Sequence, residues 1–413
     1  MAVSSVALIA LAAGVTGLLV RRWWLAVAAL AGVALASALD GHAPRSALLD
    51  GLDAMALVAG MVFVAAAASR SGLLAASAHR LTDRLPRARW LLVVTFLLAV
   101  VLTTVANLDT TAVLFTPVAL EVGSAAALPL APFALAAILG ANFGSMLLPT
   151  SNLTNLVVWR HTDLSFAAFA AEHAVIAVGA VALTLGALVL GSRFPASVRP
   201  GVSSSSSPSS LAPRQAAPAM TTAVLTDEEG PRPLARPRTV TDVTMAWMSA
   251  ATIVLLVVAF FAGLPVGPVT LAGGLVLVAV RPQLWSSRID LRLVLAALAV
   301  FGASGVLATS LDTAGRLGHV SPLGLAVLGG LLASVGTNLA ATLTLVPAAS
   351  TATLRSALLI GVNLGVGFTP VASLATVLWR DSLAARGVPT PWRRYFAVAV
   401  PLSLVFLASS VLL

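Results

Sequence analysis

The chain has 413 residues, of which 59% are hydrophobic and only 9% are charged, and its mean hydropathy is +1.00. A soluble domain carries roughly 25% charged residues, so this composition excludes one and predicts an integral membrane protein. The net charge is +9, but the basic residues are all arginine and lie mostly in short segments between apolar stretches, which is typical of membrane loops and not of a nucleic-acid partner. The sequence contains no cysteine, which excludes disulfides and thiolate metal sites.

The first apolar segments are long enough to cross a bilayer as helices. The segment nearest the start has the length of a signal peptide, but its positive charges, Arg21 and Arg22, follow it and no small-residue cleavage site stands out. We therefore expect a retained helix. The predicted crossings of this region are 3–20, 23–39 and 53–69. The arginine-rich stretch 70–89 is predicted to form a helix at the membrane surface. Its apolar face consists of Leu74, Ala78, Leu81 and Leu85.

The next apolar stretch is interrupted at residues 107–111 by the sequence Asn-Leu-Asp-Thr-Thr. If both flanking arms crossed the membrane, the later arginine-rich loops would lie on the wrong side. We therefore predict a re-entrant hairpin over 90–123, which enters and leaves at one face. Crossings at 131–158 and 174–191 complete a first membrane repeat, residues 1–191.

Residues 192–242 are rich in Ser, Pro and Arg, which is the composition of a disordered linker. Residues 243–413 then repeat the plan of the first half, with a second hairpin at about 320–355. The predicted crossings of this second repeat are 243–262, 266–280, 293–310, 357–378 and 395–413.

The distribution of arginine along the chain indicates how the chain is oriented in the membrane. Twenty of the 24 arginines fall in segments that this topology places on one side of the membrane. The four on the other side are Arg45, Arg160, Arg316 and Arg355. Because cytoplasmic loops are enriched in arginine, we predict a multi-pass protein of the cell (plasma or inner) membrane with a cytoplasmic linker and both termini outside.

An internal repeat supports this plan. GANFGSMLLPTSNL at 140–153 and GVNLGVGFTPVASL at 361–374 share a G-x-N-x-G pattern, a proline and a final leucine without a gap. Upstream, ANLDTT at 106–111 aligns with TNLAAT at 337–342. Under the predicted topology the halves begin on opposite sides. The fold expected is therefore all-α and polytopic, with inverted repeats of about five crossings each, as in many secondary transporters.

Polar residues interrupt the apolar segments at four places, two in each repeat: 107–111, 149–155, 338–342 and 369–376. Non-helical backbone inside a bilayer persists only where it lines a protein cavity, so we expect two unwound helices whose breaks meet the two hairpin tips. The alternative for a single break is a proline kink whose Ser and Thr bond back to their own helix. The residues predicted to bind substrate are Asn107, Thr110, Thr111, Ser151, Asn152, Thr154, Asn155, Asn338, Thr342, Asn363, Thr369, Ser373 and Thr376.

Asp109 is the one acid at the first hairpin tip. A charge inside the bilayer is costly, so protonation on one side and release on the other would couple transport to protons. A structural role as a helix cap is the alternative. We interpret Glu121, Glu172 and His173 as residues of the membrane interface. The histidines have no metal-ligand spacing, and we expect neither a metal nor a cofactor.

At these motifs the sequence resembles the arsenite/antimonite efflux permeases, the arsenical-pump membrane proteins of the ion transporter superfamily. The resemblance covers nearly the whole chain outside the linker and is most specific in SNLTNLV (151–157) and FTPVASLATVLW (368–379). The stretch 106–118 resembles the family's first hairpin, in which an acid usually follows the asparagine directly, whereas here Leu108 intervenes. Val366-Gly367 stands where the family usually has Pro-Lys.

The resemblance implies export of a trivalent metalloid, a small inorganic solute, as its neutral hydroxide in exchange for protons by alternating access. It is compatible with an ATPase subunit on the cytoplasmic side and with a homodimer in the lipid bilayer. The other functions left open are a symporter of di- or tricarboxylates or another oxyanion, and a sodium/proton antiporter. An anion carrier can use helix N-termini, although no arginine stands at the tips. We do not expect an enzyme, because the sequence has no nucleophile with a base and no metal constellation.

Overall fold

The computed structural model describes residues 2–20, 22–41, 44–72, 76, 84–85, 87–192, 242–286 and 291–412. Throughout these ranges the regular structure is helical, without a strand. Seven of the described helices are long and apolar enough to cross a membrane. The prediction of an all-α polytopic membrane protein is confirmed.

In the first half, three long helices precede a helical hairpin, a broken helix and a long final helix. Their bounds are α1 (Ala2–Val20), α2 (Trp23–Asp40), α3 (Arg45–Arg70), α5 (Ala88–Ala106), α6 (Leu108–Ala125), α7 (Leu130–Phe143), η1 (Pro149–Ser151), α8 (Leu153–Arg160) and α9 (Phe166–Gly191).

The second half repeats this order, and it contains a short helix, α13, which the sequence did not predict. Its elements are α10 (Val243–Phe261), α11 (Val266–Val280), η2 (Pro282–Ser286), α12 (Leu291–Ser310), α13 (Thr313–Leu317), α14 (Pro322–Gly336), α15 (Asn338–Leu345), η3 (Val346–Ala348), α16 (Ala352–Leu359), η4 (Ile360–Leu364), η5 (Gly365–Phe368), α17 (Leu374–Ala384), α18 (Trp392–Ser409) and η6 (Ser410–Leu412).

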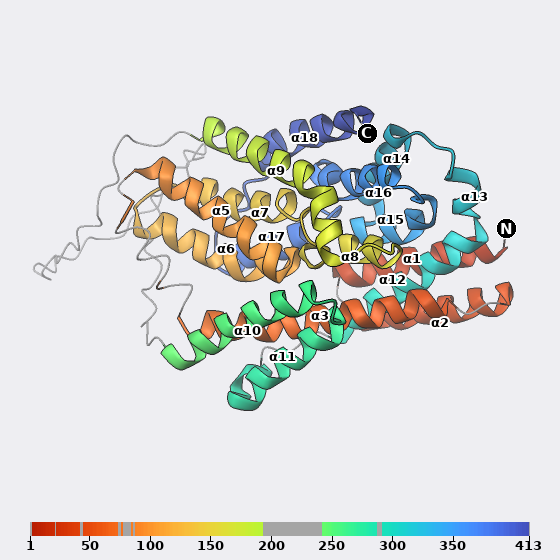
Figure 1. Ribbon diagram of the computed structural model, residues 1–413, viewed down its shortest axis with the longest axis horizontal. Helices are drawn as coiled ribbons and strands as arrows, with labels where there is room; N and C mark the ends of the chain where they lie inside the picture. The colour runs from red at the N-terminus through yellow and green to blue at the C-terminus, as the bar shows by residue number, and fades with distance from the viewer. Residues whose placement is uncertain are drawn as a thin grey trace, which may run out of the picture.

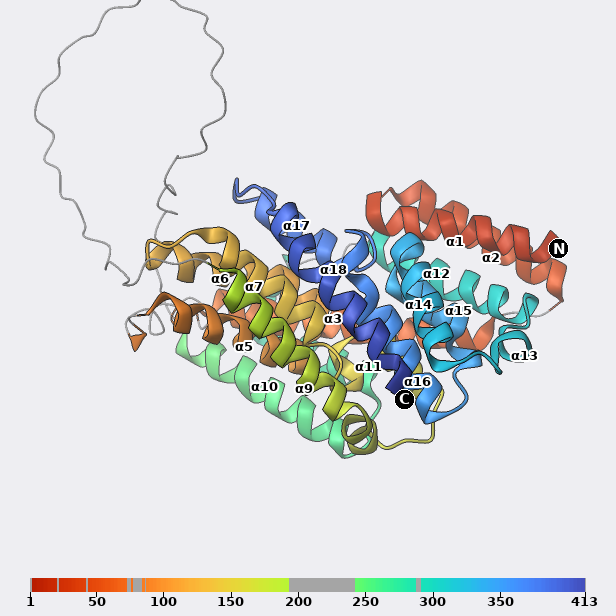
Figure 2. The same cartoon turned by 90° about the horizontal axis from the view of Figure 1, so that it is seen from above.

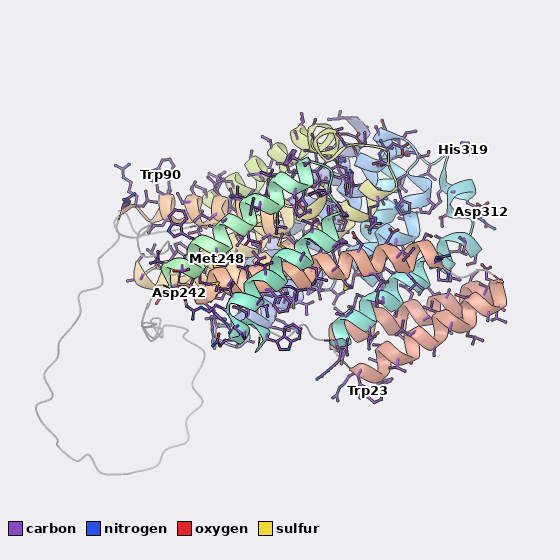
Figure 3. The ribbon with its side chains drawn as sticks, turned by 60° about the horizontal axis from the view of Figure 1, so that its bottom comes forward. Trp23, Trp90, Asp242, Met248, Asp312 and His319 are labelled. Carbon is purple, nitrogen blue, oxygen red and sulfur yellow. The ribbon has the colours of Figure 1, made fainter. Side chains whose placement is uncertain are left out.

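The two hairpins enter the bundle from opposite ends (Figures 1 and 2). Helices α5 and α6 come from the end at which α9 finishes and α10 begins, whereas α14 and α15 come from the end that carries the N-terminus and α13 (Figure 1). Figure 3 labels Trp90 and Asp242 at the first end and Asp312 and His319 at the other. Because the same order of elements enters from opposite ends, the two repeats are inverted.

Helices α3 and α11 cross where glycines bring their backbones into contact. A Cβ atom on Gly60 would lie 2.2 Å from the carbonyl oxygen of Thr270, and one on Gly274 would lie 2.7 Å from the carbonyl oxygen of Gly60. In the related position α12 packs on α2, where a Cβ atom on Gly302 would lie 2.8 Å from Val33 Cγ1. Small residues at these crossings allow the close helix packing that membrane proteins use in place of a hydrophobic driving force.

Arg160, the last residue of α8, joins the broken helix to α3. Its Nε lies 3.0 Å from Asp50 Oδ1 and its Nη1 lies 2.7 Å from Asp53 Oδ2. These ion pairs hold the end of the broken helix against the first turns of α3.

The hairpin tips share an unusual backbone conformation. Asn107 has φ 105° and ψ 149°, and Thr337 has φ 88° and ψ 150°. Positive φ is costly for residues other than glycine, and such strain is concentrated at functional sites. The backbone therefore pairs Asn107 with Thr337. The sequence alignment, which pairs Asn107 with Asn338, is wrong by one residue.

The two broken helices are interrupted earlier in the chain than predicted. The first stops at Phe143 and restarts at Leu153, and the second leaves α-helical geometry at Ile360 and restarts at Leu374. The expectation that 149–155 and 369–376 are unwound throughout is thus wrong at their carboxyl ends. For the first break the reason is local: Asn152 Oδ1 accepts a hydrogen bond from the Thr154 amide at 3.3 Å, so it caps the helix at once.

Helix α9 starts at Phe166 rather than near 174, because the Ser165 side chain accepts a hydrogen bond from the Ala168 amide at 3.1 Å and caps it. The predicted surface helix at 70–89 falls largely outside the described residues, and so does the linker 192–242 apart from its two end residues.

Candidate functional site

All four polar interruptions line one small cavity between the repeats. The first hairpin tip contributes Asp109, the first break contributes Asn152, and the second tip contributes Thr337 and Asn338. Apolar side chains complete the lining: Leu18, Leu108, Leu153, Leu339 and Leu374. The cavity measures about 30 Å³. That is about the volume that one water molecule occupies in the liquid, so the lining elements must separate to admit a larger solute.

Each hairpin tip is bonded to the break of its own repeat. Asn107 Nδ2 donates to the Thr150 carbonyl oxygen at 3.5 Å, and the Asn338 amide donates to the Ala372 carbonyl oxygen at 2.8 Å. Both contacts join a hairpin tip to a break, one through a side-chain amide and the other through a backbone amide. They satisfy backbone groups that the unwound segments would otherwise leave buried without partners.

Asn363, in the second broken helix, bonds to the first break. Its Oδ1 accepts hydrogen bonds from Asn152 Nδ2 at 3.0 Å and from Thr154 Oγ1 at 2.6 Å. Its Nδ2 donates to Asn155 Oδ1 at 2.8 Å. All four side chains are buried. Three predicted site residues of the first repeat and one of the second therefore form a single hydrogen-bonded network.

Asn142 makes the reciprocal contacts from the first broken helix to the second. Ser373 Oγ donates to Asn142 Oδ1 at 3.2 Å, and Asn142 Nδ2 lies 3.1 Å from Thr376 Oγ1 and 3.3 Å from Tyr395 Oη, which accept from it. Asn142 was not among the predicted site residues. The signal that identifies it was present, because it occupies the same position in G-x-N-x-G as Asn363.

Several other predicted residues bond through their hydroxyl groups to nearby backbone carbonyls. Such bonds are what we expect of a polar break that serves the structure and does not bind substrate. Thr111 Oγ1 donates to the Asn107 carbonyl at 2.9 Å, and Thr342 Oγ1 donates to the Asn338 carbonyl at 2.8 Å. Ser151 Oγ donates to the Leu148 carbonyl at 2.8 Å. These bonds stabilise the tips and the first break and leave the hydroxyl protons unavailable to a solute.

Two predicted residues remain. Thr369 Oγ1 donates to the Ser334 carbonyl of α14 at 2.8 Å, so it ties the second break to the second hairpin. Thr110 is buried in the first turn of α6. Neither is among the residues that line the central cavity.

Four helices begin around the cavity, namely α6, α8, α15 and α17. Side-chain oxygens cap three of them: Asn107 Oδ1 accepts from the Asp109 amide at 2.8 Å, Asn152 caps α8, and Thr337 Oγ1 accepts from the Ala340 amide at 3.4 Å. Ser373, at the start of α17, makes no such cap and donates instead to Asn142. The first turns of helices carry partial positive charge, so this arrangement favours a negatively charged group in the cavity.

Asp109 lies in the first turn of α6 and lines the cavity. Among the described residues, none forms a hydrogen bond or an ion pair with its carboxylate. The tip geometry pairs Asn107 with Thr337, so Leu339 occupies the equivalent position in the second repeat. Within the described part of the chain, the cavity therefore holds a single acid.

His173, interpreted from the sequence as an interfacial residue, lies inside the helical bundle. Its side chain is fully buried, because α9 begins at Phe166 and carries it inward among the neighbouring helices. Over the described ranges, no cluster of three or more His, Asp or Glu residues is arranged to hold a metal ion.

Comparisons with known proteins agree with this fold. The profile of the citrate transporter family (CitMHS) matches residues 2–379. The crystal structure of the YdaH transporter of Alcanivorax borkumensis, described as having an unusual topology, is 19% identical and has a TM-score of 0.50. The match covers 89% of this chain and 86% of that one, and at this identity it supports the fold alone. A search of curated proteins finds no match.

The family match and the structure support the ion transporter superfamily to which the sequence resemblance pointed, but the family is described by citrate and not by arsenite. It is a family of membrane transporters and not of enzymes. Because its profile spans nearly the whole chain, this protein belongs to the citrate transporter family.

Proposed function

We propose that this protein is a secondary active transporter of small hydroxylated carboxylates, of the di- and tricarboxylate class that includes citrate. The observation that carries the proposal is the start of four helices around one cavity, whose polar lining consists of Asn152, Thr337, Asn338 and the single acid Asp109. A carboxylate near a helix N-terminus is stabilised by roughly 0.3–1 kcal/mol, and by up to about 2 kcal/mol in a partly buried setting. Several such termini can hold an anion without an arginine.

In this proposal, Asp109 couples the binding of the anion to the binding of a proton. An ionised Asp109 repels a carboxylate in the same cavity, whereas a protonated Asp109 does not. Binding of the proton and of the anion therefore strengthen each other, and by linkage each raises the affinity for the other by the same factor. Because the two bind together, the expected mode is proton symport by alternating access.

The orientation and the partners remain as predicted from the sequence. We propose that the linker and the arginine-rich segments face the cytoplasm and that the chain works within the lipid bilayer of the cell membrane. A proton gradient is sufficient to drive this cycle, and an ATPase subunit or a second copy of the chain would be an addition to it.

Efflux of a trivalent metalloid is the second candidate. The described cavity lining contains no lysine, arginine or histidine, which suits a neutral trihydroxide, and the motifs at 151–157 and 368–379 resemble those of metalloid permeases. A neutral solute is not repelled by ionised Asp109. In that case proton and substrate are exchanged and not carried together.

Transport into membrane vesicles distinguishes the two functions. Right-side-out vesicles with an acidic exterior should accumulate radiolabelled citrate, and a protonophore should abolish the accumulation. Everted vesicles with an acidic interior should accumulate arsenite if the second function is correct. Vesicles from cells without the transporter provide the baseline. Accumulation of arsenite without any citrate transport would contradict the carboxylate proposal.

A further inference from the structure

A cluster of charged and polar side chains joins α9 of the first repeat to α16 of the second. Arg355 Nη2 on α16 lies 3.6 Å from Glu172 Oε2 on α9, and the two side chains are 15% and 20% exposed. His173, next to Glu172 in sequence, is fully buried. None of these residues lines the central cavity, so the cluster is separate from the site described above.

Three buried polar atoms in this cluster have no hydrogen-bond partner among the described residues: Glu172 Oε1, His173 Nε2 and Arg355 Nε. A buried polar atom without a partner costs about 1–3 kcal/mol. Buried polar groups in proteins are nearly always paired with protein atoms or with ordered water. Ordered water would supply partners to such atoms.

The hydrogen bond of Nδ1 determines which nitrogen of the neutral His173 ring carries the proton. Nδ1 lies 2.9 Å from the Phe169 carbonyl oxygen, which can only accept a hydrogen bond, so Nδ1 carries the proton. The ring is also stacked on Phe169 with a centroid separation of 4.2 Å, which fixes its orientation. In the neutral ring Nε2 is then an acceptor.

The cluster thus offers one donor, Arg355 Nε–H, and two acceptors, Glu172 Oε1 and His173 Nε2. A water molecule matches this set, because it has two hydrogens to donate and lone pairs to accept. Among the described residues, the charged groups that act on His173 are Glu172 and Arg355. Helices α5, α7, α10 and α18, which also pack against α9, present none to it.

We propose that Glu172, His173 and Arg355 hold one water molecule and form a proton-binding site, in which a proton from bulk water passes through the bound water to His173 Nε2. The lone pair of Nε2 takes the proton, the bound water is restored, and release follows the reverse path. With Glu172 and Arg355 ionised, uptake changes the cluster from neutral to a single positive charge. The Glu172 carboxylate compensates the imidazolium that forms.

The significance of this site for transport rests on the proposed function. Arg355 stands on α16, which leads directly into the segment that holds Asn363. A change of charge at the base of this helix acts on the same broken helix that bonds to Asn152. His173 would then be a second proton carrier beside Asp109.

Nitrogen NMR of the purified full chain, labelled with ¹⁵N in its histidine rings, tests the site without reference to any substrate. The chain has five histidines, so the signals that vanish in His173→Asn belong to His173. We expect the Nδ1–H tautomer at neutral pH and conversion to the doubly protonated ring on acidification. A wild-type ring that stays in one form, or one with its proton on Nε2, overturns the proposal.

His161 provides the matched control. Its Nδ1 also lies 2.8 Å from the carbonyl four residues earlier, that of Val157, but its side chain is exposed. His161→Asn should leave the signals of His173 unchanged. If His173→Asn folds poorly, His173→Gln makes the same assignment.

The role in transport is measured separately. The pH profile of citrate exchange should flatten in His173→Asn and keep its wild-type shape in His161→Asn. An unchanged profile in His173→Asn would show that the site does not serve transport. If no citrate is transported by the wild-type protein, the proposed function fails, while the NMR titration still decides whether the proton site exists.

Discussion

Asn142 and Asn363 occupy equivalent positions in the two inverted repeats, and each is hydrogen-bonded to the break of the other repeat. Asn363 accepts from Asn152 at 3.0 Å, and Asn142 accepts from Ser373 at 3.2 Å. The two unwound segments are therefore held together by side-chain amides that come from opposite halves of the chain. Neither half can form this contact without the other.

Removal of either amide should destabilise the protein. Asn142→Ala and Asn363→Ala each leave buried partners unsatisfied, which costs about 1–3 kcal/mol. We expect both variants to unfold at lower temperature in detergent, as measured by circular dichroism. Thr104→Ala is the matched control, because Thr104 Oγ1 donates only to the Val100 carbonyl of its own helix at 2.9 Å. If Asn142→Ala and Thr104→Ala are equally stable, Asn142 does not stabilise the contact between the two unwound segments.

Asn152 and Ser373 should differ in their effect on substrate affinity. Asn152 lines the cavity and bonds to Asn363, whereas Ser373 bonds to Asn142 and is not among the lining residues. The loss of one buried partner, about 1–3 kcal/mol, corresponds to roughly 5- to 150-fold in half-saturation. We expect Asn152→Ala to lie within that range and Ser373→Ala to change half-saturation less. Concentration series of citrate uptake in vesicles give both values, and an unchanged half-saturation in Asn152→Ala would place the substrate elsewhere.

Asp109→Asn should uncouple transport from protons. Asparagine preserves the size of the side chain and can still interact with the first turn of α6, but it does not titrate. We expect the variant to insert and fold normally, to exchange substrate down its gradient, and to fail to accumulate substrate when a proton gradient is imposed. The control is Asp312→Asn, since Asp312 accepts from the Gly315 amide at 3.2 Å and is not among the residues that line the cavity. Proton-driven accumulation by Asp109→Asn would remove Asp109 from the coupling mechanism.

The predicted orientation can be checked by labelling single cysteines in this cysteine-free chain. Ser46 is exposed in the first turn of α3, at the end of the molecule where both Arg160 ion pairs lie, whereas Ser209 belongs to the predicted linker. On intact cells, an impermeant maleimide should label Ser46→Cys and not Ser209→Cys. Labelling after lysis controls for the reactivity of each thiol. If both positions react equally on intact cells, the two segments do not lie on opposite sides of the membrane.

The sequence by itself determined the class of fold. Apolar length identifies the crossing helices α1, α2, α10 and α11 to within a few residues, because the cost of burying polar groups in lipid acts on each segment separately. The distribution of arginine required the two hairpins, and the G-x-N-x-G repeat indicated that the broken helices are related. Each of these signals is carried by residues close together in the chain.

The tertiary structure decided which polar side chains meet. The sequence could not show that Asn142 bonds to Ser373, because these residues are far apart in the chain and Asn142 lies within an apolar segment. It also could not show that Thr337, and not Asn338, is the strained residue of the second tip, or that His173 is buried. A hydrogen bond is directional and spans about 3 Å, so its partner depends on how the two inverted repeats pack against each other, which no local pattern of residues specifies.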